Sequence, residues 1–263
     1  MAALSLPRFY ARAAWAAVAG SAGDRANLIP QIVGMMINNG FMLTLWFLFF
    51  AGFHGVGGWR LPDVALLTGL IMTMVGVAGV AFGGYRDMAA AILAGEIDAL
   101  LTQPRPVLAR LLARDSLPSA WGDLLMGIVI LVAFAGLGWR DVPWLAMGWV
   151  CGLIVYLSAA VTFASLAFWA AGARSLARDL TEWVILVSSY PGSIYSGVSH
   201  LAVFTLLPAG FIVLTPVSLV RRPSLETLAT EAVATLTYGI LALTVFHRGL
   251  ARYRRGSTPA AGI

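Results

Sequence analysis

Lysine is absent from this chain of 263 residues, and cysteine occurs once, as Cys151. Without lysine the chain cannot contain the phosphate-binding loop of nucleotide hydrolases, whose motif requires one. A single cysteine excludes a disulfide within the chain, and its place inside an apolar run favours a small packed residue. Charged residues make up only 11% of the chain, against about 25% in soluble domains. These absences argue against a soluble globule.

Motifs for catalysis and metal binding are also missing. The chain has no G-x-S-x-G, and the serines around position 190 resemble those of loops and helix breaks more than nucleophiles. The three histidines lie far apart in the sequence, without a nearby pattern of cysteines or acids that would indicate a metal site. They are His54, His200 and His247. No enzyme is predicted.

Long apolar runs dominate what is present, since hydrophobic residues make up 60% of the chain. A helix needs about 20 apolar residues to cross about 30 Å of hydrocarbon. Five segments meet this requirement: Ile29–Phe53, Leu61–Gly84, Ala120–Gly138, Trp144–Ala171 and Leu225–Phe246. Residues 1–28 are predicted to form an amphipathic helix on the membrane surface rather than a secretory signal, because their apolar part is short.

The region 180–220 is too long for one span and is interrupted by Pro191, Pro208 and Pro216. It either crosses twice, which makes seven spans, or crosses once and continues as a re-entrant hairpin over residues 188–220, which makes six. Six spans place 13 of the 17 arginines on one side and 4 on the other, whereas seven spans give 11 against 6. The positive-inside rule therefore favours six spans with the hairpin between spans five and six. The four arginines on the outer side are Arg60, Arg140, Arg221 and Arg222.

The longest cytoplasmic segment of this topology, residues 85–118, is polar and contains two closely spaced prolines. Apolar residues recur at helical spacing over residues 87–101, which predicts one amphipathic helix. Pro104 and Pro106 end that helix in a stiff turn, and a second amphipathic helix follows over residues 107–114. We expect a helix–turn–helix elbow that projects from the bundle. A plain interfacial cover for the bundle is the alternative.

The run "YRDMAAAILAGEIDALLTQPRPVLARLLARD", residues 85–115, resembles the cytoplasmic segment of the permease subunits of bacterial ABC exporters of the second type. The resemblance covers nearly the whole chain, because that family combines an amphipathic N-terminal helix, six spans and a re-entrant region after the fifth. In the family this segment is the coupling helix, which docks into a groove of the nucleotide-binding subunit. Carried over, the contact residues would be Glu96, Asp98, Gln103, Pro104, Arg105 and Pro106.

The resemblance implies an all-α membrane protein with a single permease domain over residues 1–263, placed in the bacterial inner membrane with both termini cytoplasmic. It would be the transmembrane subunit of an exporter, without a cofactor of its own. Two copies of a separate ATPase would hold ATP and Mg. The other implied partners are a second permease, identical or related, and membrane lipids. Nucleic acid is not expected, because the arginines behind the net charge of +5 cluster at the ends of apolar runs.

Few polar side chains lie within the apolar runs. Asn38 and Asn39 either hydrogen-bond a neighbouring helix or line a pathway, and the packing role is favoured. Tyr190 and Tyr195 lie in the predicted hairpin, where anchoring is their simplest role, and the resemblance places them near an outer gate. Glycines in the second span predict close helix packing within the bundle: Gly69, Gly76, Gly79, Gly83 and Gly84.

Two other functions compete with this interpretation. A stand-alone secondary transporter would use acids in the middle of its spans, or broken helices in repeated halves, to bind a coupling ion. Charges within the predicted spans are sparse, and Asp179 and Glu182 are interpreted as residues that favour a helix N-terminus at the start of the fifth span. The third candidate is an intramembrane enzyme or an assembly protein. The missing catalytic set weighs against the enzyme.

The arginine distribution predicts that both termini are cytoplasmic. Single cysteines placed at each end of a Cys151-free variant should react with a membrane-impermeant thiol reagent only after the membrane is opened. The measurement is labelling of intact and permeabilised cells. A C-terminus that is labelled in intact cells would contradict the six-span topology.

Overall fold

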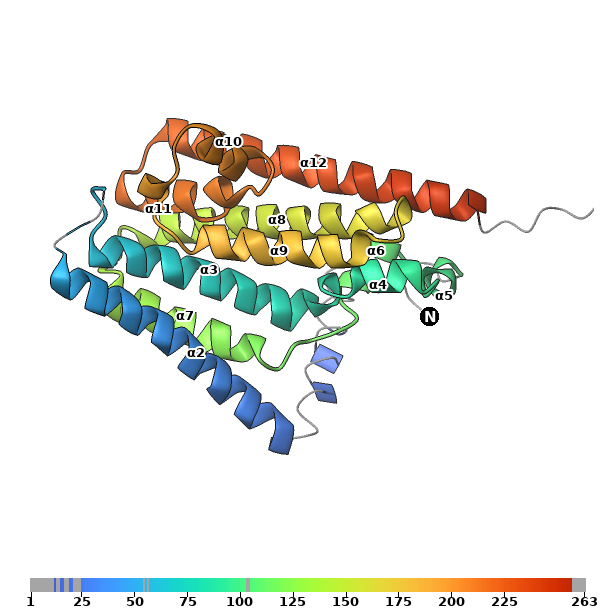
Figure 1. Cartoon of the computed structure of the whole chain (residues 1–263), viewed down its shortest axis with the longest axis horizontal. Coiled ribbons are helices and arrows are strands. Elements are labelled where there is room, and N and C mark those ends of the chain that lie inside the picture. Colours follow the sequence, from blue (N-terminus) through green and yellow to red (C-terminus); the bar gives the residue numbers. More distant parts are fainter. Residues whose placement is uncertain are drawn as a thin grey trace, which may run out of the picture.

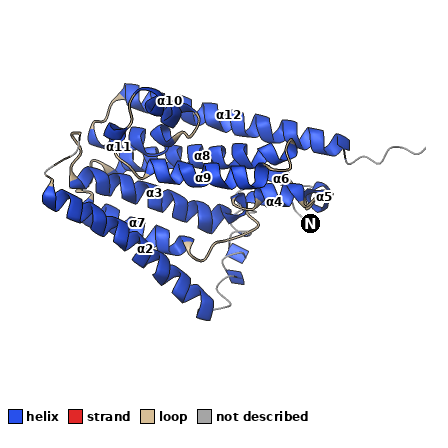
Figure 2. Ribbon diagram, in the orientation of Figure 1, coloured by secondary structure: helices blue, strands red, loops and turns tan. Residues whose placement is uncertain are grey.

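The computed structural model describes residues 25–53, 55, 57–102 and 105–256, together with the isolated residues 12, 15, 16, 19 and 20 (Figure 1). Within these residues every regular element is a helix (Figure 2). The prediction of an all-α protein is therefore confirmed. The predicted surface helix of residues 1–28 falls largely outside the described residues.

Four long helices have the length and apolarity needed to cross a membrane. They contain α2 (Arg25–Gly52), α3 (Leu61–Phe82), α8 (Val142–Ser165) and α12 (Leu225–Gly256). A fifth candidate is a pair of helical segments, Gly197–Thr205 and Gly210–Arg221, which meet at a bend of 77°. Helices of this kind satisfy their backbone hydrogen bonds internally, which hydrocarbon requires of any spanning segment.

The bounds of the helices differ from those of the predicted spans, and for α7 and α9 the difference changes the interpretation. α7 (Ala120–Phe134) has only 15 residues and ends before Gly136, whose φ of +61° favours glycine and is common where helices end. α9 (Ala173–Ser188) begins seven residues before Leu180, so Asp179 and Glu182 lie in its second and third turns. The interpretation of these two carboxylates as helix N-terminal residues is therefore wrong.

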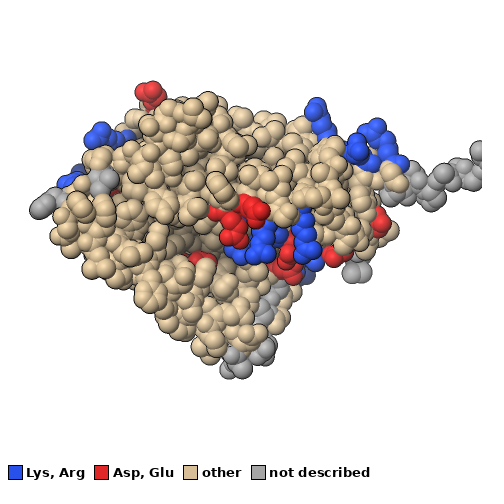
Figure 3. All heavy atoms as spheres, in the orientation of Figure 1, with Lys and Arg blue, Asp and Glu red and all other residues tan. Residues whose placement is uncertain are grey.

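The helices α2, α3, α7, α8, α9 and α12 run between two ends of the molecule (Figure 1). The hairpin end carries the loop between α2 and α3, the loop between α7 and α8, and residues 189–221. The elbow end carries residues 83–119, between α3 and α7, and the loop between α8 and α9. The face shown in Figure 3 is largely uncharged, and acidic and basic side chains adjoin one another in its elbow half.

α3 lies at the centre of the bundle. In the helical stretch that begins with it, Leu61–Leu93, 78% of the apolar 18-residue core is buried, against 11% for the corresponding part of α2. Glycines allow α7 to approach it closely. A methyl group at Gly76 would lie 2.6 Å from the Leu124 backbone nitrogen, and one at Gly127 would lie 2.8 Å from the Thr73 backbone nitrogen. The predicted glycine packing is therefore confirmed, and it brings the two backbones together from both sides.

Residues 189–221, called the hairpin segment here, contain four short helical pieces between Ser188 and the loop before α12. They are the 3₁₀ turn Gly192–Ile194, α10 (Gly197–Thr205), the π-helical turn Gly210–Leu214 and α11 (Thr215–Arg221). Pro208 separates α10 from the π-helical turn, because proline cannot donate the backbone hydrogen bond that a continuous helix needs.

Both ends of the hairpin segment lie at the hairpin end of the bundle. At its start, the Tyr190 ring lies 6.4 Å from the Trp46 ring of α2. At its end, Arg221 Nη2 donates hydrogen bonds of 2.8 Å to the carbonyl oxygens of Pro62 and Ala135. Arg221 Nε lies 2.9 Å from Asp63 Oδ1, an ion pair in which this N–H makes no hydrogen bond to any described residue. One guanidinium thus ties α11 to the start of α3 and the end of α7.

Close packing of α3 on α7 can be tested by adding bulk at a glycine. Gly76→Leu should lower the free energy of unfolding by about 1–3 kcal/mol or more, because the added carbons meet backbone atoms that cannot rotate away. Gly239→Leu is the matched control, because nothing lies within 4 Å of a methyl group built there. Thermal unfolding of both variants in detergent is the measurement. Equal losses for the two variants would mean that the glycine contact does not limit packing.

Candidate functional site

The segment between α3 and α7, called the elbow here, contains α4 (Met88–Leu93), α5 (Ile97–Leu101) and α6 (Val107–Leu112). The single helix expected over residues 87–101 is wrong, because the chain turns at Gly95 with a φ of +75°. The Gly95 N–H donates to the Ile92 carbonyl at 3.3 Å, and the Glu96 N–H donates to the Ala91 carbonyl at 3.1 Å. This pair of bonds is the Schellman pattern that ends a helix at a glycine.

The elbow packs on the bundle instead of projecting freely from it. Many of its apolar side chains are almost fully buried, and α4 contacts α8 and α9. The buried set includes Met88, Ile92, Ile97 and Leu111. Its outward surface carries Glu96, Asp98 and the 40% exposed side chain of Leu93. Burial of one face fixes where these outward residues lie.

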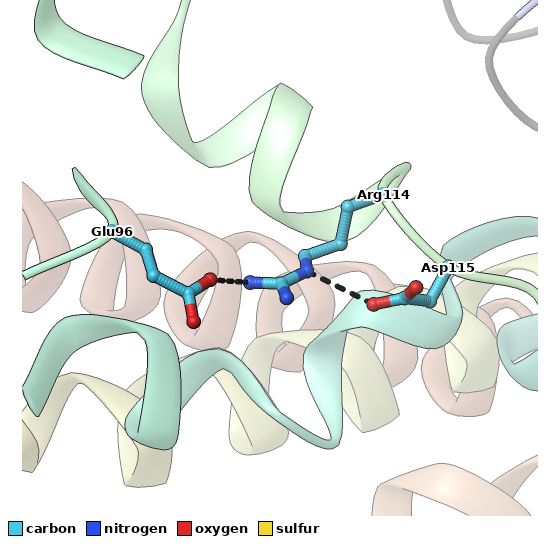
Figure 4. A network of polar contacts seen from close by, with 3 residues as sticks. All are labelled: Glu96, Arg114 and Asp115. Atoms are coloured by element: carbon cyan, nitrogen blue, oxygen red, sulfur yellow. Dashed lines mark hydrogen bonds and ion pairs between the residues drawn. The ribbon is translucent and has the colours of Figure 1, made fainter. Parts of the chain in front are cut away.

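Glu96, which is expected to contact the ATPase, has a partner within the chain. Arg114 Nη1 donates to Glu96 Oε2 at 2.7 Å, and Arg114 Nε donates to Asp115 Oδ2 at 2.9 Å (Figure 4). Burial lowers the pKa of Arg114, but the hydrogen bond to Glu96 and the charge of Asp115 together raise it above its usual value. One turn earlier, Arg110 Nη1 donates to the Leu100 carbonyl at 3.3 Å. Arg110 of α6 and Arg114, two residues after its end, thus hold both ends of α5.

The other expected contact residues lie around the same turn. Asp98 is exposed, and its carboxylate lies beside the Tyr253 hydroxyl of α12. Arg105 is half-buried, and Pro106 directly precedes α6. Gln103 and Pro104 lie outside the described residues. The structure therefore places Glu96 and Asp98 on the outward face of the elbow and links one of them to the last long helix.

The two asparagines of α2 point in different directions. Asn39 is buried, and its Nδ2 donates to Asp123 Oδ1 of α7 at 2.8 Å. Asn38 is exposed. The hydrogen bond gives Asn39 the helix-packing role that was favoured for this pair. Asp123 was overlooked as an acid within a predicted apolar span, which is a signal the sequence does contain.

The two tyrosines that were expected near an outer gate hold the start of the hairpin segment. The Tyr195 hydroxyl donates to the Val187 carbonyl of α9 at 2.6 Å. Because this carbonyl lies near the end of α9, the bond satisfies an acceptor that the helix leaves open. Tyr190 packs edge-on against Trp46.

Sequence reasoning also missed a polar cavity of about 250 Å³ beside the elbow. It lies where the end of α3 and the start of α4 meet α8 and α9. Its polar lining comes from Tyr85, Arg86, Asp87, Arg178, Thr181 and Glu182. Its apolar lining comes from Ala89, Leu117, Ala160, Ala164, Ala177 and Ile185. No local motif announces this cavity, because its walls come from segments far apart in the chain.

A second overlooked acid is Glu231 of α12. Its side chain is fully buried, and neither carboxylate oxygen has a hydrogen-bond partner among the residues described. The residues that the structure describes contain no group of three or more histidines, cysteines and acids that could hold a metal ion. The five apolar segments predicted to span the membrane contain four charged residues, all acids: Asp63 and Glu226 lie close to span ends, whereas Asp123 and Glu231 are buried.

The profile of a family described as ABC-2 family transporter protein matches residues 36–257. The matched range runs from the first half of α2 to the end of α12 and includes the elbow, the cavity and the hairpin segment. No curated protein and no solved structure gives a match.

Two neighbouring residues separate the contributions of burial and charge to the elbow. Ile97→Ala should lower the free energy of unfolding by about 2–4 kcal/mol, because it leaves a cavity at a fully buried position. Glu96→Gln should cost less than about 1 kcal/mol, because its ion pair with Arg114 is exposed to solvent. Thermal unfolding in detergent compares the two. A larger loss for Glu96→Gln would show that the charges, rather than burial, hold the elbow.

Proposed function

The chain belongs to the ABC-2 family of transporter proteins, and we propose that it is the membrane-spanning subunit of an exporter driven by a separate ATPase. The family match over residues 36–257 is the observation that carries this function. Permeases of the family are transport components that are not themselves catalytic, and they generally pair with ATPase subunits. ATP and Mg would then be bound by the partner.

The proposed topology has six spans, with the hairpin segment re-entering from the outer side. Support comes from the direction of successive helices, which alternates between the two ends (Figure 1). The hairpin segment begins beside Trp46 and ends beside Pro62, so both of its ends lie at the hairpin end. In the proposed topology the elbow end and both termini lie in the cytoplasm, which the arginine distribution favours. The proposed membrane is the bacterial inner membrane.

In this proposal the two ATPase subunits close when they bind ATP, and their movement is transmitted to the permease through the elbow. Its outward face offers Glu96, Asp98 and Leu93 to a partner. Its inward face contacts α8 and α9 through α4, and Asp98 adjoins α12 through Tyr253. A push on the elbow would therefore move helices on both sides of the polar cavity. Coupling of this kind needs a rigid lever, which the Arg110 and Arg114 contacts supply.

The complete exporter would contain two ATPase copies and two permeases, identical or related, surrounded by membrane lipid. The apolar surface of α2 is largely exposed, so it is free to face lipid or a second permease. The family resemblance favours an amphiphilic or lipid-like substrate, or a natural product. Glu231 keeps the alternative of a secondary transporter open, because a buried acid without a partner suits ion coupling. Transport that needs an ion gradient but not ATP would favour it.

Asp98 is the sharpest test of ATPase docking. Glu96 is less suitable, because Glu96→Arg would place two arginines together and disturb the elbow itself. Asp98→Arg should reduce the ATPase that co-purifies with the wild-type chain by about tenfold or more, since a charge of the wrong sign at an interface costs several kcal/mol. The measurement is a pull-down, with size exclusion as the folding control.

Tyr253→Phe is the matched control, because it removes the contact between Asp98 and the Tyr253 hydroxyl without changing any charge. We expect it to leave the association with the ATPase intact. Wild-type association of Asp98→Arg would mean that the elbow only covers the bundle. An equal loss in both variants would place the effect inside this chain rather than at the ATPase.

A further inference from the structure

The cavity beside the elbow contains charged groups whose hydrogen-bonding capacity is not fully used by the described residues. Arg86 Nε donates to the Tyr85 hydroxyl at 3.3 Å, and the Tyr85 and Tyr156 hydroxyls lie 2.9 Å apart. Both tyrosines are buried, so they hold this side of the guanidinium in place. The two terminal nitrogens of Arg86 make no hydrogen bond or ion pair among the residues described.

Glu182 of α9 lies on the other side of the cavity. It is within electrostatic reach of Arg86, but the two groups form no ion pair in the described structure. Its contact with Arg178 is long, at 3.8 Å, and both side chains are exposed. Arg86 also interacts electrostatically with Asp123, whose carboxylate already accepts a hydrogen bond from Asn39. The cavity thus offers the terminal donors of Arg86, which no described residue engages, and the Glu182 carboxylate, whose ion pair with Arg178 is long.

The charged face of α9 cannot point into lipid, because ionised side chains in hydrocarbon are costly. Arg174, Arg178, Asp179 and Glu182 all lie in its first ten residues, at the elbow end. Figure 3 shows acidic and basic side chains next to one another in this half of the molecule. This part of α9 must therefore face water, and the cavity lies between that face and the bundle.

Size and lining restrict what the cavity can hold. Its volume of about 250 Å³ is below the roughly 300 Å³ at which pockets for whole drug-sized ligands begin. Small side chains leave this space, because Ala160 and Ala164 of α8 face Ala177 of α9. At the end away from the elbow the lining becomes apolar at Ile185, and the rest of α9 up to Val187 is apolar. A polar head fits inside, with an apolar tail continuing along α9.

We propose that this cavity binds the head group of a zwitterionic amphiphile, the substrate that the exporter carries. The anionic group of the head pairs with Arg86, whose planar guanidinium suits phosphate or carboxylate oxygens. The ammonium group of the same head pairs with Glu182. Arg178 and Thr181 line the cavity beside them. This inference rests on the proposed transport function and adds the chemical class of the substrate.

Lysophosphatidylethanolamine is the probe, because its head carries a phosphate and an ammonium group. Binding to the purified full-length chain is measured by tryptophan fluorescence in a maltoside detergent, with lysophosphatidylglycerol as the purely anionic comparison. Arg86→Gln should weaken binding of both lipids by about tenfold or more, through loss of charged hydrogen bonds. Glu182→Gln should weaken binding of the ethanolamine lipid only, because only that lipid has an ammonium group.

Two matched controls carry the same chemical changes on α9 outside the cavity lining. They are Arg174→Gln and Asp179→Asn, and both should bind like the wild type. Ala164→Leu retains every charge and fills the cavity, so it should abolish binding even if Arg86→Gln fails to fold. Equal losses in the controls, or equal effects of Glu182→Gln on the two lipids, would overturn the head-group site.

Stimulation of ATP hydrolysis by the probe separates a carried substrate from a resident lipid. In the complex with its ATPase the wild type should be stimulated, and Ala164→Leu should not. A lipid that co-purifies in the cavity and does not exchange with the probe would overturn the transport role. A wild type that retains its ATPase but does not bind the probe refutes the site and leaves the exporter function standing. Absence of any ATPase partner would refute the function itself.

Discussion

The close approach of α3 to its neighbours is the constraint on which the rest of the molecule depends. Gly76 brings the α7 backbone against α3, and further along, a methyl group at Gly83 would lie 2.7 Å from the Asp115 carbonyl oxygen. At Gly84 it would collide with the Leu111 carbonyl. Without an attraction between apolar surfaces in lipid, helices associate through such close packing. α3 therefore aligns α7, and the 3₁₀ turn Gly83–Tyr85 that follows it seats the elbow against the bundle.

The position of the elbow follows from that seat. Leu111 is held against the turn that follows α3, so Arg110 of the same helix and Arg114 just after it point toward α5. Burial of Ile97 supplies the stability, and the exposed ion pairs mainly set orientation. The outward residues are then carried on a supported helix instead of a loose loop. A partner that docks there can act on α8, α9 and α12 together.

Several polar groups inside the bundle follow the rule that hydrocarbon imposes on them, with the buried Glu231 as an exception. Asn39 pairs with Asp123, Arg221 satisfies carbonyls at the ends of two helices, and Tyr195 does the same for α9. Each of these groups would cost several kcal/mol if it were left unpaired in lipid. The cavity of Arg86 contains hydrogen-bond donors that the described residues leave unpaired. It lies beside the charged face of α9, which faces water. The unpaired groups are therefore candidates for binding rather than for packing.

The sequence by itself determined the membrane class, the long apolar helices and the polar segment between α3 and α7, because hydropathy and helical period act within a few residues. It even contained the signal for the break at Gly95. Only the tertiary structure decided that Glu96 meets Arg114, 18 residues away, and that Asn39 meets Asp123, 84 residues away. It also decided the shorter bounds of α7 and the cavity walls drawn from α4, α8 and α9. Such pairings depend on how whole helices pack, and local pattern carries no information about that.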